Sequence, residues 1–306
     1  FVRGETQTGW RLLAAEGIGL GSAAGGVVGL AVTGASPRTM PVFAWMMIHG
    51  VGLFGVSYLA DIYGSVAGPD GGGRPVRRAP WLALELGHRF VYDPIFDYGH
   101  LAVVGAEWRH AFFALEAEGL LAADDDNQRV RLAPRFRLLG PRPDRPADDG
   151  GFVDLRSALV WHRYGTERFS MTLLDVAARG RLDLHHVGRT LRGAFAEAEL
   201  GIAAGATKHE GFDAEPEELL LGGFAFGLYL GHARDGWGEV ALGYDHRHDG
   251  YAAGLKAVGL GSGVAGHFTI DARLGVSGPW GVGLEGAVGS AWLGGVSLLY
   301  RAGGER

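Results

Sequence analysis

The sequence predicts a mainly β protein, an antiparallel transmembrane β-barrel of about 12 strands preceded by an N-terminal apolar helical hairpin. Three observations predict this fold class. From Trp81 onward, short segments alternate bulky apolar residues with small or charged ones. Each segment is about 10 residues long, which is enough for a tilted strand to cross a bilayer. Ahead of these segments lie two apolar runs, each close to the roughly 20 residues that a membrane-spanning helix requires.

The alternation is clearest between Leu219 and Tyr300. There one face of a segment carries Phe268, Ile270 and Leu274, while the other carries Asp271 and Arg273. A period of two places the two sets on opposite sides of a sheet. In a transmembrane barrel the bulky set faces lipid and the charged set faces the lumen. A soluble barrel or sandwich shows the same alternation and remains the alternative. The segments number about twelve or thirteen, and because bacterial single-chain barrels close with an even number we expect twelve.

Aromatic residues near the ends of these segments are expected to form the two interfacial girdles of a membrane barrel. The residues concerned are Trp237, Tyr244, Tyr251, Trp280, Trp292 and Tyr300.

The chain divides by composition into a glycine-rich apolar hairpin (residues 1–68), a linker (69–80) and the barrel (81–306). The hairpin arms are expected at Trp10–Gly34 and Pro41–Tyr63. The linker is too rich in Gly and Pro for a regular element. A buried hairpin in a soluble domain, or a glycine-rich loop without helix, stays open as an alternative to a membrane hairpin.

The first arm carries a tandem GxxxG pattern of glycines spaced four residues apart: Gly17, Gly21, Gly25 and Gly29. On a helix this spacing forms a stripe that another backbone can approach closely, so we expect it to be the helix-packing surface. The second arm is expected to present a bulky partner interface: Met46, Met47, Phe54 and Leu59. A closed barrel already satisfies its backbone hydrogen bonds and has no structural need for these helices. Their apolar surface must be covered by outer-membrane lipid, by the barrel or by another protein. We therefore expect other envelope protein subunits, or further copies of this chain, as partners.

The expected lumen face carries charges of both signs, often two residues apart on one strand. They are Glu85, Arg89, Glu107, Arg109, Arg131, Arg135, Arg137, Asp154, Arg156, Glu197, Glu239, Asp245, Arg247, Asp271 and Arg273. Such side chains reach one another across a barrel of this size, and buried charges require pairing. The pattern favours a lumen filled with ion pairs, although the same residues could line a narrow channel.

Composition and motifs give little indication of chemistry. The chain has no cysteine, which excludes disulfides, thiolate metal sites and a cysteine nucleophile. A net charge of −6 provides no basic field for nucleic acid. For a lipid hydrolase at the barrel rim, Ser170 and His162 are the best available pair. His185 and His186 have no assignable partner. We expect no catalytic residue, no cofactor and no metal site.

The segment Gly295–Tyr300 resembles the closing signal of outer-membrane β-barrels of diderm bacteria, Gly-x-x-apolar-x-aromatic, with Leu298 and Tyr300 at the key places. The alternation over residues 81–300 resembles the same class. The chain departs from this class in two places: further residues follow Tyr300, and a helical hairpin precedes the barrel. The resemblance implies an outer-membrane location with a signal peptide already removed. Function is then expected to be a non-enzymatic structural or scaffold subunit, with a narrow porin-like channel and a rim lipid hydrolase as alternatives.

Overall fold

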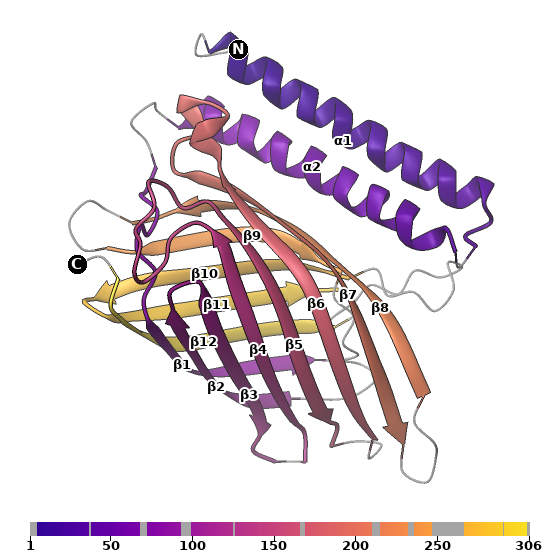
Figure 1. Cartoon of the computed structure of the whole chain (residues 1–306), viewed down its shortest axis with the longest axis vertical. Helices are drawn as coiled ribbons and strands as arrows, with labels where there is room; N and C mark the ends of the chain where they lie inside the picture. The colour runs from indigo at the N-terminus through magenta and orange to yellow at the C-terminus, as the bar shows by residue number, and fades with distance from the viewer. Residues whose placement is uncertain are drawn as a thin grey trace.

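The computed structural model describes residues 5–36, 38–67, 72–92, 99–124, 126–165, 169–209, 215–231, 236–246, 266–289 and 291–304. A helical hairpin precedes a closed barrel of twelve antiparallel strands, as the sequence predicted (Figure 1). The helices are α1 (Thr6–Val32) and α2 (Met40–Val66). The strands are β1 (Leu82–Tyr92), β2 (Gly99–His110), β3 (Phe113–Ala122), β4 (Gln128–Leu139), β5 (Phe152–Arg163), β6 (Phe169–Asp183), β7 (Ala194–His209), β8 (Glu215–Tyr229), β9 (Gly238–Asp245), β10 (His267–Ser277), β11 (Trp280–Val288) and β12 (Trp292–Ala302). Each strand pairs with its neighbours in the chain, and β1 closes the barrel on β12.

Two ends of the barrel are distinguished below. The termini end is where β1 begins and β12 ends, and it also carries two short 3-10 turns between β6 and β7: η1 (Leu184–His186) and η2 (Arg189–Leu191). The opposite end carries the connection from β3 to β4. Strands β7 and β8 extend far toward the opposite end, where β7 runs to His209 and β8 begins at Glu215.

The outer wall is apolar and the inner wall is charged. On β1, Leu84 and Leu86 are 42% and 62% exposed on the outside, whereas Arg89 points inward and is 8% exposed. Exposed aromatic residues gather outside both ends of the strands. Near the termini end they are Trp81, Trp108, Phe112, Phe136 and Trp280, and near the opposite end Phe90, Tyr92, Trp161, Phe268 and Trp292. An apolar band between two aromatic girdles on a closed barrel is the surface of a transmembrane β-barrel, because closure satisfies the backbone without water.

Two residues assigned to the girdles need comment. Trp237 is not a girdle residue: its ring lies inside the lumen over Gly275 and Gly281, with the Arg301 guanidinium 3.7 Å from the ring centroid. The reason is its register, since Trp237 stands two residues before the inward-facing Glu239. Tyr251 lies outside the described residues.

The hairpin arms approach most closely at Gly19, Gly26 and Gly50, and of the predicted stripe only Gly25 and Gly29 face α2. A Cβ added to Gly19 would lie 2.6 Å from the backbone nitrogen of Phe54, and one added to Gly26 would lie 2.6 Å from that of Met47. Each helix backbone therefore occupies the space that a side chain would need on the other helix.

The prediction for Gly17 and Gly21 as the hairpin contact was wrong, because an added Cβ at either position has no atom within 4 Å. Gly25 meets only the Met46 Cε at 3.5 Å, and Gly29 faces the ring of Phe43. The physical reason is the helix repeat. At about 100° per residue, a spacing of four advances about 40° beyond a full turn, so the stripe winds around α1. A spacing of seven, as between Gly19 and Gly26, stays nearly in line with the neighbouring helix.

The four residues of the predicted partner interface on α2 do not share one surface. Leu59 packs toward the barrel, against a buried cluster that includes Ala60, Leu191 and Phe226. The side chain of Met46 reaches α1, and Met47 contacts α1 through its backbone. Met46 and Phe54 are each 37% exposed, and the ring of Phe54 lies on the face of α2 that stays open, where it stacks on Tyr58 with centroids 6.3 Å apart. That face consists of Val51, Phe54, Tyr58 and Ile62.

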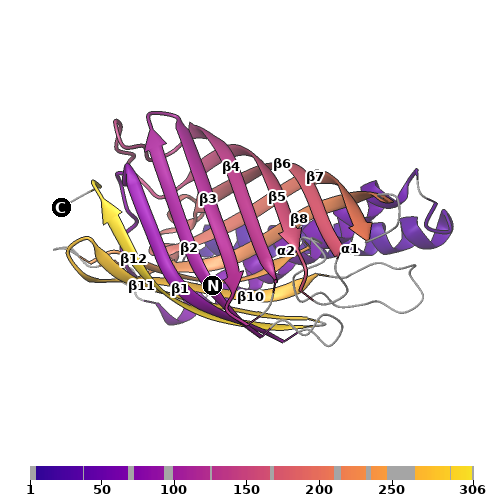
Figure 2. The same ribbon diagram turned by 90° about the horizontal axis from the view of Figure 1, so that it is seen from below.

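The hairpin lies outside the wall, beside β7 and β8 (Figures 1 and 2). Midway along α2, His49 Nε2 lies 3.1 Å from the backbone oxygen of Glu199 on β7. Nearby, Gly52 leaves room for the ring of Phe224 on β8. Near the termini end, the Tyr63 hydroxyl donates to the Arg192 carbonyl at 2.7 Å, and Arg11 donates to the Val187 carbonyl at 2.8 Å. These contacts fix the hairpin against the barrel exterior at two levels.

Candidate functional site: the charged lumen

Ion pairs fill the lumen near the termini end. Arg137 binds Asp154 through two contacts of 2.5 and 2.9 Å, and Arg135 lies 3.7 Å from the same carboxylate. The Glu107 carboxylate forms ion pairs with both Arg135 and Arg109. The Asp154 residue is 0% exposed, so its charge depends on these guanidinium groups for compensation.

Arg181 is the centre of this network. It binds Glu197 at 2.6 Å and Glu239 at 2.7 Å, thereby linking β6 to both β7 and β9. Its guanidinium carbon also lies 3.9 Å from the ring centroid of Phe195 and 5.3 Å from that of Phe152. A guanidinium over aromatic faces gains cation–π attraction in addition to its ion pairs. Arg181 is therefore held on several sides at once.

A second group of pairs lies further from the termini end. Arg89 forms a two-point contact with Glu285, at 2.5 and 2.9 Å, which bridges β1 and β11. Glu118 lies 3.9 Å from Arg89 and 3.7 Å from Arg129. Side chains at mid-depth are more open: Asp271 and Arg273, 3.3 Å apart, are each 46% exposed. The lumen is thus densest at the termini end and looser toward its middle.

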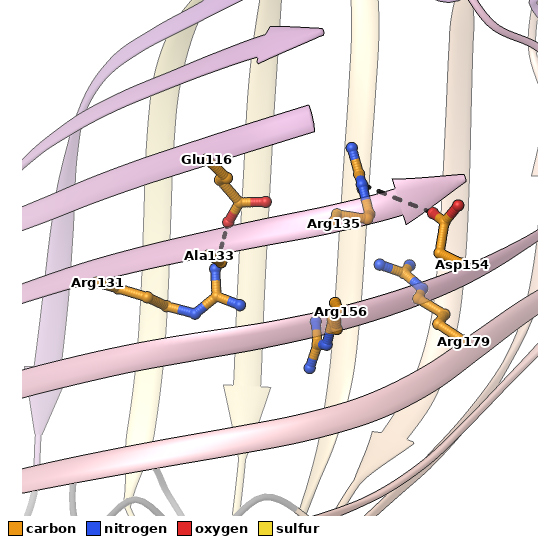
Figure 3. A pocket seen from close by; sticks show the side chains of 7 residues that line it. All are labelled: Glu116, Arg131, Ala133, Arg135, Asp154, Arg156 and Arg179. Carbon is orange, nitrogen blue, oxygen red and sulfur yellow. Dashed lines mark hydrogen bonds and ion pairs between the residues drawn. The ribbon is translucent and has the colours of Figure 1, made fainter. Parts of the chain in front are cut away.

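A small cavity of about 30 Å³ lies between the two groups (Figure 3). Its lining consists of Glu116, Arg131, Ala133, Arg135, Asp154, Arg156 and Arg179. Four of these residues carry guanidinium groups and two carry carboxylates, so the lining has an excess of positive charge. Such a lining suits an anion or ordered water, and the volume is far too small for an organic solute.

Aromatic side chains and the linker pack at the termini end of the lumen. Phe195 is 0% and Tyr229 3% exposed inside the lumen. The ring of Phe195 lies against Gly227, where any side chain would collide with it. Above them the linker crosses the barrel end: Gly73 N–H donates to the Tyr229 carbonyl and Arg74 N–H to the Gly231 carbonyl, each at 2.9 Å.

The loop between β4 and β5 adds to this packing. Ala147 N–H donates to the carbonyl of Arg77 in the linker at 2.8 Å. Gly150 approaches both the Tyr229 hydroxyl and Pro75 so closely that a Cβ there would clash. Linker, loop and aromatic rings therefore pack together over the part of the network around Arg181.

The structure brings most of the predicted lumen charges together on the inner wall. The inward-facing residues are Glu85, Arg89, Glu107, Arg109, Arg131, Arg135, Arg137, Asp154, Arg156, Glu197, Glu239, Asp245, Asp271 and Arg273. Arg247 lies outside the described residues. Sequence analysis missed Arg129, Arg179, Arg181 and the aromatic residues packed around Arg181. A signal was present, because Asp175, Arg179, Arg181 and Asp183 are separated by even intervals along β6, as inward-facing residues must be.

The pair considered for a lipid hydrolase does not form. His162 points into the lumen, is 0% exposed, and has its Nε2 2.9 Å from the Asn127 Oδ1. In the β5–β6 register His162 pairs with Met171, whereas Ser170 pairs with Arg163. Ser170 is therefore offset by one residue and faces the outside of the wall. A one-residue offset on a strand places two side chains on opposite faces, so Ser170 and His162 cannot act together.

Known proteins provide fold-level likeness only. No family model and no curated protein matches this sequence. Among solved structures, a KdgM porin in complex with disordered oligogalacturonate has 11% identity and a TM-score of 0.43, covering 71% of this chain and 98% of that one. The outer membrane protein Omp33 of Acinetobacter baumannii has 9% identity and a TM-score of 0.37, covering 74% and 99%. The translocator domain of the autotransporter NalP of Neisseria meningitidis has 12% identity and a TM-score of 0.38, covering 80% and 92%.

These similarities are low, and the assignment to a class rests on the chain itself. Outer-membrane barrels have a closed antiparallel topology with an even strand number, an apolar outer band between aromatic girdles, and a charged lumen. This chain has all of these features. The chain is a bacterial outer-membrane β-barrel of twelve strands that carries a helical hairpin on its outer wall.

Proposed function

We propose that this barrel is a sealed structural subunit of an envelope assembly rather than a route for solutes. The observation that supports the proposal is the packing at the termini end, where Arg181 lies among Phe152, Phe195 and Tyr229 beneath the linker. Conduction requires a continuous path in which an ion binds weakly enough to leave. A guanidinium paired with two carboxylates and packed on aromatic rings offers no such path.

The hairpin supports the structural part of the proposal. Both helices are long and apolar enough to cross a membrane. Ile18 and Val28 on α1 are 66% and 59% exposed, so lipid or a protein must cover them. The open positions at Gly17 and Gly21 give one part of this face a flat surface that a second apolar helix can approach, since close backbone contact drives helix association in lipid. We assign this face to a helix of another subunit.

Planar-bilayer recording tests the closure. The purified wild-type barrel is expected to give no stable discrete openings. The double variant Phe195→Ala/Tyr229→Ala removes two of the rings packed around Arg181 and is expected to produce them. Phe268→Ala, which removes an exposed ring from the outer wall, is the matched control and should stay silent. Stable openings from the wild-type protein would contradict the sealed barrel.

Subunit association is tested separately, by cross-linking in native membranes. Gly17→Leu/Gly21→Leu should abolish the cross-linked species, because leucine fills the flat surface. Gly55→Leu is the matched control, since Gly55 on α2 also has open space around it. Unchanged cross-linking in the Gly17/Gly21 variant would mean that this face contacts lipid alone.

A narrow anion-selective channel is the second function that a specific observation favours. The excess of arginine around the cavity, with Arg131, Arg135 and Arg156 near one another, would attract an anion. In that case wild-type openings would show a reversal potential that favours anions, and Arg135→Leu with Arg156→Leu would reduce both conductance and selectivity. The sealed barrel predicts that these variants change stability alone.

A further inference from the structure

Two histidines and two aspartates converge outside the termini end of the barrel. Asp149 lies in the loop between β4 and β5, while Asp183, His185 and His186 lie at the end of β6 and in η1. Asp149, His185 and His186 each offer one ligand atom, and these three atoms lie within 4.8 Å of one another. The two imidazole rings have centroids 3.8 Å apart. Neither the lumen network nor the hairpin contacts use these side chains.

Each histidine is already oriented by a carboxylate. His186 Nε2 lies 2.7 Å from Asp149 Oδ2, and His185 Nδ1 lies 2.9 Å from Asp183 Oδ1. The Asp183 side chain is only 5% exposed and also accepts from the backbone N–H of His185 and of Gly150. A buried carboxylate that accepts a hydrogen bond from Nδ1–H favours the tautomer whose lone pair is on Nε2. This carboxylate–histidine arrangement is the usual support of a metal-bound imidazole.

The distances suit a small transition-metal ion. Ligands about 2.1 Å from a tetrahedral ion lie about 3.4 Å from one another. Torsion of the His185 and His186 side chains, which are 38% and 53% exposed, can close the remaining distance. Asp149 is held meanwhile, because its Oδ1 accepts from the Gly151 N–H at 2.8 Å. Its Oδ2 is then the atom that exchanges its contact with His186 for one with the ion.

We propose that Asp149, His185 and His186 bind a divalent transition-metal ion such as Zn²⁺, with Asp183 as the residue that positions His185. Two imidazole nitrogens and one carboxylate oxygen favour Zn²⁺, Ni²⁺ or Cu²⁺ over Mg²⁺ and Ca²⁺, which require mostly oxygen ligands. The exposure of the histidines leaves a fourth coordination position for water. The bound ion ties the β4–β5 loop to η1, on the side where the loop meets the linker.

The test uses the full chain in detergent, stripped with a chelator and titrated with Zn²⁺ in a calorimeter. One saturable equivalent is expected. His186→Ala and Asp149→Asn should each weaken binding at least tenfold. Asp183→Asn should weaken it about tenfold while the stoichiometry stays at one, because removal of an orienting carboxylate typically costs 10- to 100-fold. Each variant is checked for folding by its migration on SDS gels, because a folded barrel migrates faster unheated than boiled. If His186→Ala does not fold, Asp149→Asn still tests the site, because it keeps a polar side chain there.

Matched controls are His88→Ala and His110→Ala, which remove imidazoles of β1 and β2 and should leave the affinity unchanged. Co²⁺ substitution gives a second readout, because tetrahedral coordination by nitrogen and oxygen produces visible absorbance that His185→Ala should abolish. The proposal is overturned if no saturable equivalent binds, if the cluster variants bind like wild type, or if affinity falls in a control instead. In those cases the four side chains form hydrogen-bonded pairs that join the loop to η1 and nothing more.

Discussion

Removal of the Arg181 charge should destabilise the barrel strongly, and the contacts allow an estimate. In Arg181→Met, Glu197 keeps its contact with Arg179, while Glu239 loses the 2.7 Å partner that it has in the wild type. Breaking a buried pair typically costs about 3–5 kcal/mol, and the 27% exposure of the Glu239 side chain favours the lower end of that range. Lost packing of the guanidinium on Phe195 adds about 0.5–1 kcal/mol. The expected loss in free energy of unfolding is therefore about 3–4 kcal/mol.

The assay is urea unfolding in phospholipid vesicles, followed by tryptophan fluorescence. Arg163→Met is the matched control, because its pair with Asp126 is exposed, at 48% and 71%, and should change stability by less than about 1 kcal/mol. Adding Glu239→Gln to Arg181→Met should restore part of the loss, since the unpaired carboxylate is then neutral. A free energy of unfolding for Arg181→Met within about 0.5 kcal/mol of wild type would refute the reasoning, because it would mean that bulk water already solvates these charges.

Three further predictions follow from the hairpin and the lumen. Gly26→Leu should separate α1 from α2 and raise amide hydrogen exchange in α1, whereas Gly21→Leu should not, because only Gly26 has a backbone against it; equal exchange in both variants would contradict the contact. Hydrogen bonds from Thr8 and then Thr190 hold the pKa of Glu5 below its ordinary 4.5. The stability that ionised Glu5 contributes is therefore present above the unfolded-state pKa and is lost as pH falls through the lower folded-state pKa. Protection of the amides near Glu5 from hydrogen exchange should fall below about pH 4.5 in the wild type and be independent of pH in Glu5→Gln. Asp154→Asn should lower the urea midpoint at an unchanged denaturant slope, because it leaves Arg137 without its carboxylate; an unchanged midpoint would contradict the pairing.

Much of the barrel could be predicted from the sequence because a strand has a period of two. Arg131, Arg135 and Arg137 alternate with apolar residues, and that alone assigns them to the lumen. The same rule would have placed Trp237 inside, since it stands two residues before Glu239. An aromatic residue near a strand end is typical of a girdle, but at Trp237 the register decides which face the ring takes.

The hairpin and the metal-binding cluster show where sequence patterns are insufficient. Composition predicts two apolar helices, but which face of α1 meets α2 depends on the crossing geometry, and this geometry favours Gly19 and Gly26 over the regular spacing of Gly17 and Gly21. Asp149 and His186 lie in separate connections with no periodicity. They meet because β5 and β6 return to the same end of the barrel, which becomes apparent only when the barrel is closed.

The central claim, a lumen sealed at its termini end, is tested most directly by the reach of a membrane-impermeant thiol reagent. The chain has no cysteine, so Asp271→Cys introduces a single thiol at mid-depth, at a position whose side chain is 46% exposed in the lumen. The protein is reconstituted in vesicles of known orientation, and the reagent is added to one side at a time. The sealed barrel predicts no reaction from the side of the termini end, and it predicts reaction from that side in Phe195→Ala/Tyr229→Ala. Equal labelling of the wild-type background from both sides would contradict the account.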